Sequence, residues 1–151
     1  MTRNPPSSAT DDVFAAQTPE VAVVRSFLAA LELLDVDRAL RLLDDEVVYT
    51  NVSLPTVRGR TAVGRLLRRF ARVSSEFGVQ THRIAGNGAV VLTERTDTIV
   101  VGPMRTSFWV CGTFEVHDGR ITLWRDYFDW ADITVATLRG LAGIVVPALR
   151  R

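Results

Sequence analysis

The first third of the chain carries apolar residues at helical spacing. A helix is predicted to begin after Thr18, whose hydroxyl can cap it, with Pro19 in its first turn. The apolar positions of this helix recur every three or four residues and form one stripe, which we expect to be buried. These positions are Val21, Val24, Phe27, Leu28 and Leu31.

Two more helices are predicted before the pattern changes. A short helix follows Asp35 and Asp37, carries Leu40 and Leu43, and gives way to the β-rich segment 47–49. A third helix runs from about residue 61 to residue 73, and one of its faces is apolar. That face consists of Val63, Leu66, Leu67 and Phe70.

From Glu76 onward, turn residues recur at hairpin intervals between β-branched or aromatic runs. The turns are Gly86-Asn87-Gly88, Gly102-Pro103 and Asp118-Gly119. We therefore predict a four-strand antiparallel meander. Three helices followed by a long sheet indicate an α+β cone, in which a curved mixed or antiparallel sheet wraps the N-terminal helices and leaves a deep pocket at its open end.

The length and composition indicate one domain. A chain of 151 residues with 47% hydrophobic residues can bury one core, so we expect a single domain over residues 18–151 after a flexible tail at 1–17. The tail lacks the apolar centre of a signal peptide. The apolar segment 133–149 is interrupted by Arg139 and Pro147 and is too short to cross a membrane. We expect the segment from Ala131 to be a helix that closes the pocket or packs against a second subunit.

Charge and cysteine content exclude several functions. The formal net charge is +1, which favours neither nucleic acid nor acidic partners. The cluster of arginines near the third helix has no interleaved aromatic residues, so we interpret it as a solvated face. It comprises Arg58, Arg60, Arg65, Arg68, Arg69 and Arg72.

Cys111 is the only cysteine, and we expect it to be buried and inert in a cytoplasmic protein. We interpret His82 and His117 as structural or surface residues, and no metal-binding cluster is recognisable.

Polar residues interrupt three of the predicted strands. Side chains on a strand alternate between faces, so Tyr49 shares a face with Asn51, and Arg95 with Asp97. Asp126 likewise shares a face with the apolar Trp124 and Phe128. Each pattern alone has a structural explanation, such as a buried ion pair or a hydrogen-bonded core tyrosine. Their joint occurrence indicates one polar site in an apolar pocket.

The charges of this site predict acid–base chemistry. Arg95 stays protonated, so two ionised carboxylates beside it would leave a net negative charge in a low dielectric. One retained proton makes the group neutral, with one carboxyl as an acid and the other as a base. The pocket wall is predicted to be apolar and to bind a lipophilic substrate. Its residues are Ile99, Phe108, Val110, Trp124 and Phe128.

The chain resembles the limonene-1,2-epoxide hydrolase family through three motifs in the family's order and at similar separations. They are Tyr49-x-Asn51, Glu94-Arg95-x-Asp97 and Trp124-Arg125-Asp126-Tyr127-Phe128-Asp129. The resemblance extends from about residue 19 to residue 129. It implies the cone fold shared with nuclear transport factor two and ketosteroid isomerase, a homodimer, and hydrolysis of an epoxide without a metal or organic cofactor.

The resemblance also implies a role for each polar residue. Asp126 would be the general base that deprotonates a water molecule held by Tyr49 and Asn51. Asp97 would be the general acid that protonates the epoxide oxygen, and Arg95 would bridge the two carboxylates. The expected substrate is a lipophilic epoxide of the terpene, fatty-acid or sterol type, opened by direct attack of water.

Two other functions stay open. A ketosteroid-isomerase-like enzyme or a cyclase could use a pocket tyrosine and aspartate on the same fold, although Arg95 would hinder the protonated aspartate that such a site needs. A non-catalytic module that binds a small ligand would need only the pocket. The sequence leaves the physiological substrate, the stereochemistry and the regiochemistry undetermined.

Overall fold

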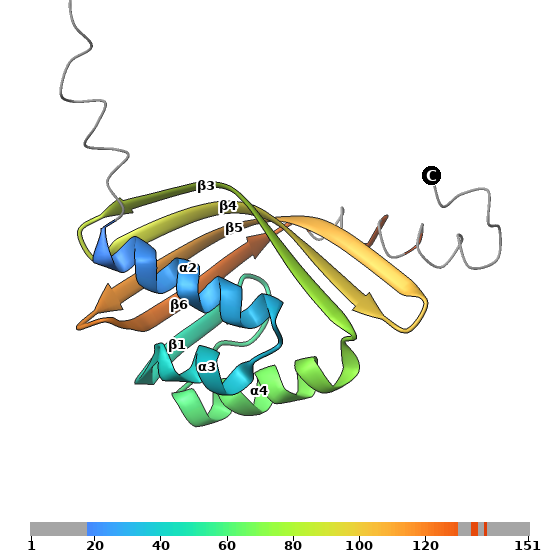
Figure 1. Ribbon diagram of the computed structural model, residues 1–151, viewed down its shortest axis with the longest axis horizontal. Helices are drawn as coiled ribbons and strands as arrows, with labels where there is room; N and C mark the ends of the chain where they lie inside the picture. Colours follow the sequence, from blue (N-terminus) through green and yellow to red (C-terminus); the bar gives the residue numbers. More distant parts are fainter. Residues whose placement is uncertain (1–17, 130–133, 136–137, 139–151) are drawn as a thin grey trace, which may run out of the picture.

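The computed structural model describes residues 18–129, 134–135 and 138, and in that part of the chain three helices lie on one side of a six-stranded sheet (Figure 1). The helices are α2 (Pro19–Glu32), α3 (Val36–Arg41) and α4 (Arg60–Val73). The strands are β1 (Leu43–Asn51), β2 (Val57–Arg58), β3 (Glu76–Asn87), β4 (Val90–Val101), β5 (Met104–His117) and β6 (Arg120–Phe128). This arrangement confirms the predicted α+β class.

The sheet is mixed, with the strand order β2-β1-β6-β5-β4-β3. Strands β3 to β6 form the predicted antiparallel meander, whereas β1 pairs in parallel with β6. The register shifts between Thr81 and Arg83 on β3 and between Glu115 and Val116 on β5. Such bulges bend and twist a sheet, which helps it to curve around the helices. The short strand β2 and the parallel pairing were not predicted.

Capping residues define the ends of the first two helices. The hydroxyl of Thr18 accepts a hydrogen bond of 3.3 Å from the backbone N–H of Val21, as predicted. Asp35 caps α3 in the same way. The prediction that Leu43 belongs to this helix was wrong, because α3 ends at Arg41 and Leu43 begins β1. Leu43 is fully buried and pairs with Ile121 of β6, so non-local pairing overrides the local helical spacing.

The apolar stripe of α2 forms the centre of the core. Val24 and Phe27 are fully buried, and the rings of Phe27 and Trp124 form a T-shaped pair at a centroid distance of 5.0 Å. Phe114 of β5 packs against the same two rings, at 6.2 Å from Phe27 and 6.4 Å from Trp124. Aromatic pairs in this range stabilise a core beyond their buried area. Trp124 is therefore held from the helix layer below and from the neighbouring strand.

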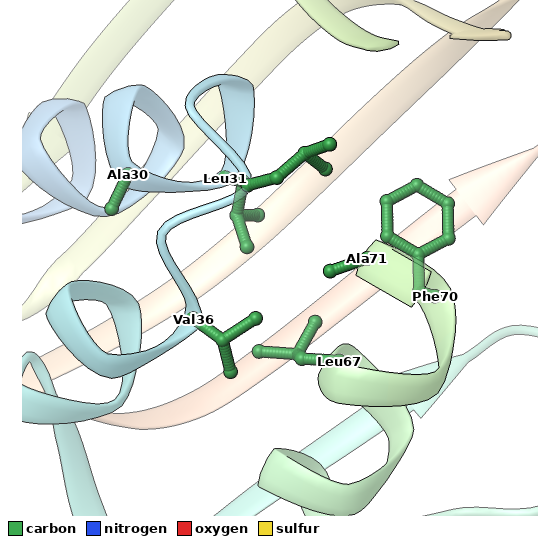
Figure 2. A pocket seen from close by; sticks show the side chains of 7 residues that line it. Ala30, Leu31, Val36, Leu67, Phe70 and Ala71 are labelled. Atoms are coloured by element: carbon green, nitrogen blue, oxygen red, sulfur yellow. The ribbon is translucent and has the colours of Figure 1, made fainter. Parts of the chain in front are cut away.

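Helix α4 buries only part of its predicted apolar face. Val63 and Leu67 are buried, whereas Leu66 is 41% exposed. Figure 2 shows that side chains of α2, α3 and α4 surround a small hollow, which has a volume of about 10 Å³ and is lined by apolar residues. A water molecule needs at least this volume and several polar partners, so we interpret the hollow as a packing gap. The arginines at positions 65, 68, 69 and 72 are exposed, as expected for a solvated face.

Two predicted segments lie outside the described residues. They are the N-terminal tail, 1–17, and most of the C-terminal segment after Asp129, and both interpretations stay predictions. Within the described part of the chain, no helix has the length and apolar character needed to span a bilayer.

Candidate active site

The register of the sheet brings the predicted polar residues together on its concave face. Asn51 of β1 pairs with Asp126 of β6, which pairs with Gly112 of β5, which in turn pairs with Thr93 of β4. Residues paired across strands point to the same face, so these four positions form one row across the sheet. Tyr49 lies on the same face, because it is two residues from Asn51 on β1. Arg95 and Asp97 do so as well, because they are two and four residues from Thr93 on β4.

Arg95 links the two carboxylates. Its Nε donates to both oxygens of Asp97, at 3.0 and 3.1 Å, and its Nη2 lies 2.8 Å from Oδ1 of Asp126. Its Nη1 donates to the hydroxyl of Thr93 at 3.1 Å. The three charged side chains are at most 5% exposed. One buried guanidinium therefore holds two acids that come from strands on either side of β5.

Asp126 has a second donor. The indole N–H of Trp124 donates to Oδ2 of Asp126 at 2.9 Å, so each carboxylate oxygen faces a different donor. We predicted Trp124 only as an apolar wall, and its N–H was missed although the two residues lie on the same strand face. Because Trp124 is packed in the aromatic core, it also holds the carboxylate in place.

Tyr49 and Asn51 form a polar pair next to Asp126. The amide Nδ2 of Asn51 donates to the phenol oxygen of Tyr49 at 3.0 Å, and the Tyr49 ring lies 4.0 Å from the Trp124 ring. In the described part of the chain, Oδ1 of Asn51 is buried and accepts no hydrogen bond. Buried acceptors without a partner are rare, so this atom indicates a place where a polar ligand can bind.

Burial and the neighbouring charges shift the pKa values of the site. It raises the pKa of the Asp97 carboxyl from 3.8 to about 6, against the opposite pull of the Arg95 charge. Burial also raises the pKa of Asp126, and it outweighs the opposite effects of Arg95 and the Trp124 N–H. For Arg95, burial alone would lower the pKa, but the charges of Asp126 and Asp97 outweigh it and raise the pKa overall. Burial, together with the charge of Asp126, raises the pKa of Tyr49 well above its usual range, so its phenol stays neutral.

These polar side chains lie in a cavity of about 600 Å³. Its polar lining residues are the five predicted ones, and every other lining side chain is aliphatic or aromatic. The helices contribute Leu28 and Leu31 of α2 and Leu66, Leu67 and Phe70 of α4. Leu54, which is 48% exposed, also lines the cavity. A mainly apolar pocket of this size with a few convergent polar groups is typical of a small-molecule site.

Four of the five predicted wall residues line this cavity: Ile99, Phe108, Trp124 and Phe128. Val110 does not, because it is fully buried between its larger register partners, Arg95 and Phe128, on the same face. Val110 thus lies in the sheet between two residues of the site but does not line the cavity itself. The lining residues from the helices were not predicted, since helical spacing alone does not distinguish a cavity wall from ordinary core.

The remaining reactive side chains lie elsewhere. His82 is exposed and lies 2.8 Å from the hydroxyl of Thr96, and His117 is exposed beside Glu115. Cys111 is half-buried instead of buried, because it lies on the outer face of the sheet. Over residues 18–129, 134–135 and 138, no group of three or more His, Cys, Asp or Glu side chains is arranged to hold a metal ion.

Known proteins share this chain's sequence and fold. Residues 18–139 match the family model described as the limonene-1,2-epoxide hydrolase catalytic domain. The chain belongs to the limonene-1,2-epoxide hydrolase family. Epoxide hydrolase EphG of Mycobacterium tuberculosis (strain ATCC 25618 / H37Rv) is 52% identical over 128 residues, which cover 84% of this chain and 85% of the relative. The resemblance to this family is thereby confirmed.

Solved structures confirm the cone fold of this family member. The structure of an M. tuberculosis LEH-like epoxide hydrolase matches with a TM-score of 0.80 and 50% identity, covering 85% of this chain and 96% of that one. A putative SnoaL-like polyketide cyclase from Shewanella denitrificans OS-217 matches with a TM-score of 0.73 at 13% identity, covering 78% and 95% of the two chains. The second match shows the fold alone.

The first prediction concerns the protonation of Asp97 in this member of the limonene-1,2-epoxide hydrolase family. In a titration followed by carboxyl ¹³C NMR, Asp97 should protonate with a midpoint near pH 6, because its burial outweighs its ion pair with Arg95. The folded chain then binds more protons than the unfolded chain between pH 3.8 and about 6. The contribution of Asp97 to the free energy of unfolding should therefore fall as the pH rises through that window.

The Asp126→Asn variant serves as the control for this titration. It removes a neighbouring negative charge and leaves Arg95 to Asp97 alone, so the Asp97 midpoint should move to lower pH. A wild-type midpoint at or below the ordinary value of 3.8 would contradict the balance of burial and charge described above.

Proposed function

We propose that the chain adds water directly to a lipophilic epoxide and forms a vicinal diol by concerted general acid–base catalysis. The observation that carries this proposal is the geometry of Arg95, which holds Asp97 and Asp126 side by side in an apolar cavity. Family membership supports epoxide hydrolysis, and the site geometry supports the division of roles between the two carboxyls.

Hydrogen-bond accounting supports a water site beside Asp126. A water molecule has two donors, which Oδ1 of Asp126 and Oδ1 of Asn51 can accept, and the Tyr49 O–H can donate to it. The Tyr49 oxygen already accepts from Asn51, which leaves its proton for the water. Three fixed partners would leave one lone pair of the water directed at the substrate. Such positioning lowers the entropic part of the barrier.

The reaction balances with one proton on the carboxyl pair. The water oxygen forms a bond to an epoxide carbon while the carbon–oxygen bond of the ring breaks. Asp126 takes a proton from the water, and Asp97 gives its proton to the epoxide oxygen. Arg95 stays charged throughout and keeps the site neutral overall. After the diol leaves, proton exchange with solvent would return the proton to Asp97.

Asp97 suits the acid role, and Asp126 suits the base role. A pKa of about 6 leaves Asp97 partly protonated near neutral pH. Arg95 and the N–H of Trp124 favour the ionised form of Asp126, although burial raises its pKa overall. The base role is therefore assigned from position, because Asp126 pairs with Asn51 across the sheet and lies beside the proposed water site.

The cavity supports a lipophilic substrate. Its volume of about 600 Å³ and its aliphatic and aromatic lining fit a terpene epoxide or part of a longer epoxidised fatty-acid or sterol skeleton. Phe108 and Phe128 pack edge to face at 5.4 Å on this wall, which leaves a hydrophobic surface opposite the helices.

The alternatives differ in what they need from Arg95. An isomerase or cyclase that uses a protonated aspartate as an oxyanion donor is disfavoured because Arg95 contacts both carboxyls. A non-catalytic binding module would use the cavity without any turnover. We therefore keep the binding module as the second candidate, to be separated by an activity measurement.

The second prediction tests the two carboxyls. With a panel of lipophilic epoxides, wild-type protein should form diols, and Asp97→Asn and Asp126→Asn should each lower kcat by about 10²- to 10⁴-fold, because each removes one proton transfer. Asp37→Asn, at an exposed position on α3, is the matched control and should keep wild-type kcat. If no epoxide in the panel yields a diol while ligands still bind the cavity, the binding module is correct.

The third prediction tests direct attack by water. In a single turnover in H₂¹⁸O, the heavy oxygen should appear in the diol, because the water held by Tyr49, Asn51 and Asp126 is the nucleophile. Mass spectrometry of the diol and of peptides that contain Asp97 or Asp126 measures this. Label in a carboxylate of the enzyme after one turnover would mean a covalent intermediate instead.

The outer face of the sheet supports a homodimer. Leu92, Trp109 and Tyr127, on β4, β5 and β6, are 50%, 43% and 40% exposed. All three lie on the face opposite the site, because each is next to a concave-face residue. Exposed aromatic and aliphatic side chains on adjacent strands are typical of a protein–protein interface. We infer that a second copy of the chain packs here.

The fourth prediction concerns this interface. Light scattering after size-exclusion chromatography should give the mass of a dimer for the wild type. Trp109→Glu should shift the population to monomer, because it places a charge inside the apolar contact. Leu33→Glu, at a 68% exposed leucine after α2, is the control and should stay dimeric. A dimeric Trp109→Glu variant would place the contact elsewhere.

A further inference from the structure

Gly112 lies inside β5, where glycine has no evident structural reason to be. It is far from both strand ends, has no positive backbone φ, and lies away from the register shift at Glu115 and Val116. Glycine in a strand interior weakens the sheet, and it often marks a place where another group approaches the backbone closely. On the concave face, Gly112 pairs with Thr93 on one side and Asp126 on the other.

The group that approaches Gly112 is the guanidinium of Arg95. A Cβ atom at Gly112 would lie 2.4 Å from Nη1 of Arg95, 2.6 Å from the hydroxyl oxygen of Thr93 and 3.0 Å from Oδ1 of Asp126. The first two distances are too short for any side-chain atom to occupy that place. The guanidinium thus crosses β5 directly over Gly112, from its own strand β4 to Asp126 on β6.

Arg95 cannot move aside without losing its contacts. It is 1% exposed, and its three nitrogen atoms face Asp97, Thr93 and Asp126 respectively. An exposed arginine could rotate away from a new methyl group at little cost. Here the atoms that would have to yield are the ones that hold the two carboxyls in position.

We propose that Gly112 is a positioning residue, whose missing side chain creates the space in which one guanidinium bridges the acid on β4 and the base on β6. This inference rests on the proposed acid–base mechanism. Thr93 acts with Gly112, because its hydroxyl accepts from Nη1 and so fixes the outer end of the guanidinium over the glycine. Neither residue contacts the substrate; both act through Arg95.

Gly78 provides a matched comparison in the same sheet. It lies on β3, and a Cβ atom there would meet only the Cβ of Thr98, at 3.7 Å, which is an ordinary contact. A Gly78→Ala variant therefore introduces the same methyl group into a strand without touching the triad.

The fifth prediction compares Gly112→Ala with Gly78→Ala. Displacement of the guanidinium should lower kcat of Gly112→Ala by about 10²-fold, with little change in KM because the apolar cavity is intact. The acid limb of its pH–kcat/KM profile should move to higher pH, because Asp126 loses the charge that lowers its pKa. Gly78→Ala should match the wild type in both respects. Wild-type kcat and an unmoved limb in Gly112→Ala would overturn the inference.

Thr93 variants keep the inference testable if Gly112→Ala fails to fold. Thr93→Val removes the acceptor of Nη1 at constant shape and should move the acid limb in the same direction, whereas Thr93→Ser keeps the hydroxyl and should restore the wild-type profile. Equal profiles for the valine and serine variants would contradict the role of Thr93.

A carboxyl NMR titration separates this inference from the proposed function. Asp126 should protonate at higher pH in Gly112→Ala than in the wild type or Gly78→Ala, whether or not any epoxide is turned over. If the wild type forms no diol from any epoxide, the proposed function alone is refuted. An unchanged Asp126 midpoint in Gly112→Ala would refute the positioning role alone.

Discussion

The ion pairs of Arg95 are the interaction on which the site depends. Two carboxyls with almost no exposure could not both ionise in this cavity without a counter-charge, because burial of an unpaired ion costs several kcal/mol, on the order given by continuum estimates. Arg95 reduces that cost for both Asp97 and Asp126, but burial still raises the pKa of each. Arg95 therefore offsets only part of the cost of burying the two carboxyls.

The sheet fixes the positions of these charged side chains. Register pairing places Asn51, Asp126, Gly112 and Thr93 in one row, and the guanidinium lies over that row. Packing of Trp124 against the aromatic core holds the carboxylate of Asp126 from below. The helices supply part of the apolar lining of the cavity, and a low dielectric there strengthens the interactions between the buried charges. The strands that form the centre of the sheet thus also carry the polar residues of the site.

Local patterns predicted most of the fold. Errors arose where contacts between distant segments determine the secondary structure or the surroundings of a residue. The capped helix after Thr18 and the meander from Glu76 follow from short-range spacing and turn residues. Leu43 was assigned to a helix because its pairing with Ile121 lies 78 residues away in sequence, beyond any local pattern. Val110 was placed on the cavity wall because alternation gives the face of a side chain but not what covers it.

The sequence by itself determined which side chains share a strand face, because alternation depends only on the backbone of one strand. Alternation therefore placed Arg95 on the same face as Asp97, and Trp124 on the same face as Asp126. Only the tertiary structure decided that β1 pairs in parallel with β6, that the Trp124 N–H binds Asp126, and that the guanidinium crosses Gly112. These contacts join residues of different strands or depend on side-chain conformation, so packing and pairing free energies of the whole domain select them.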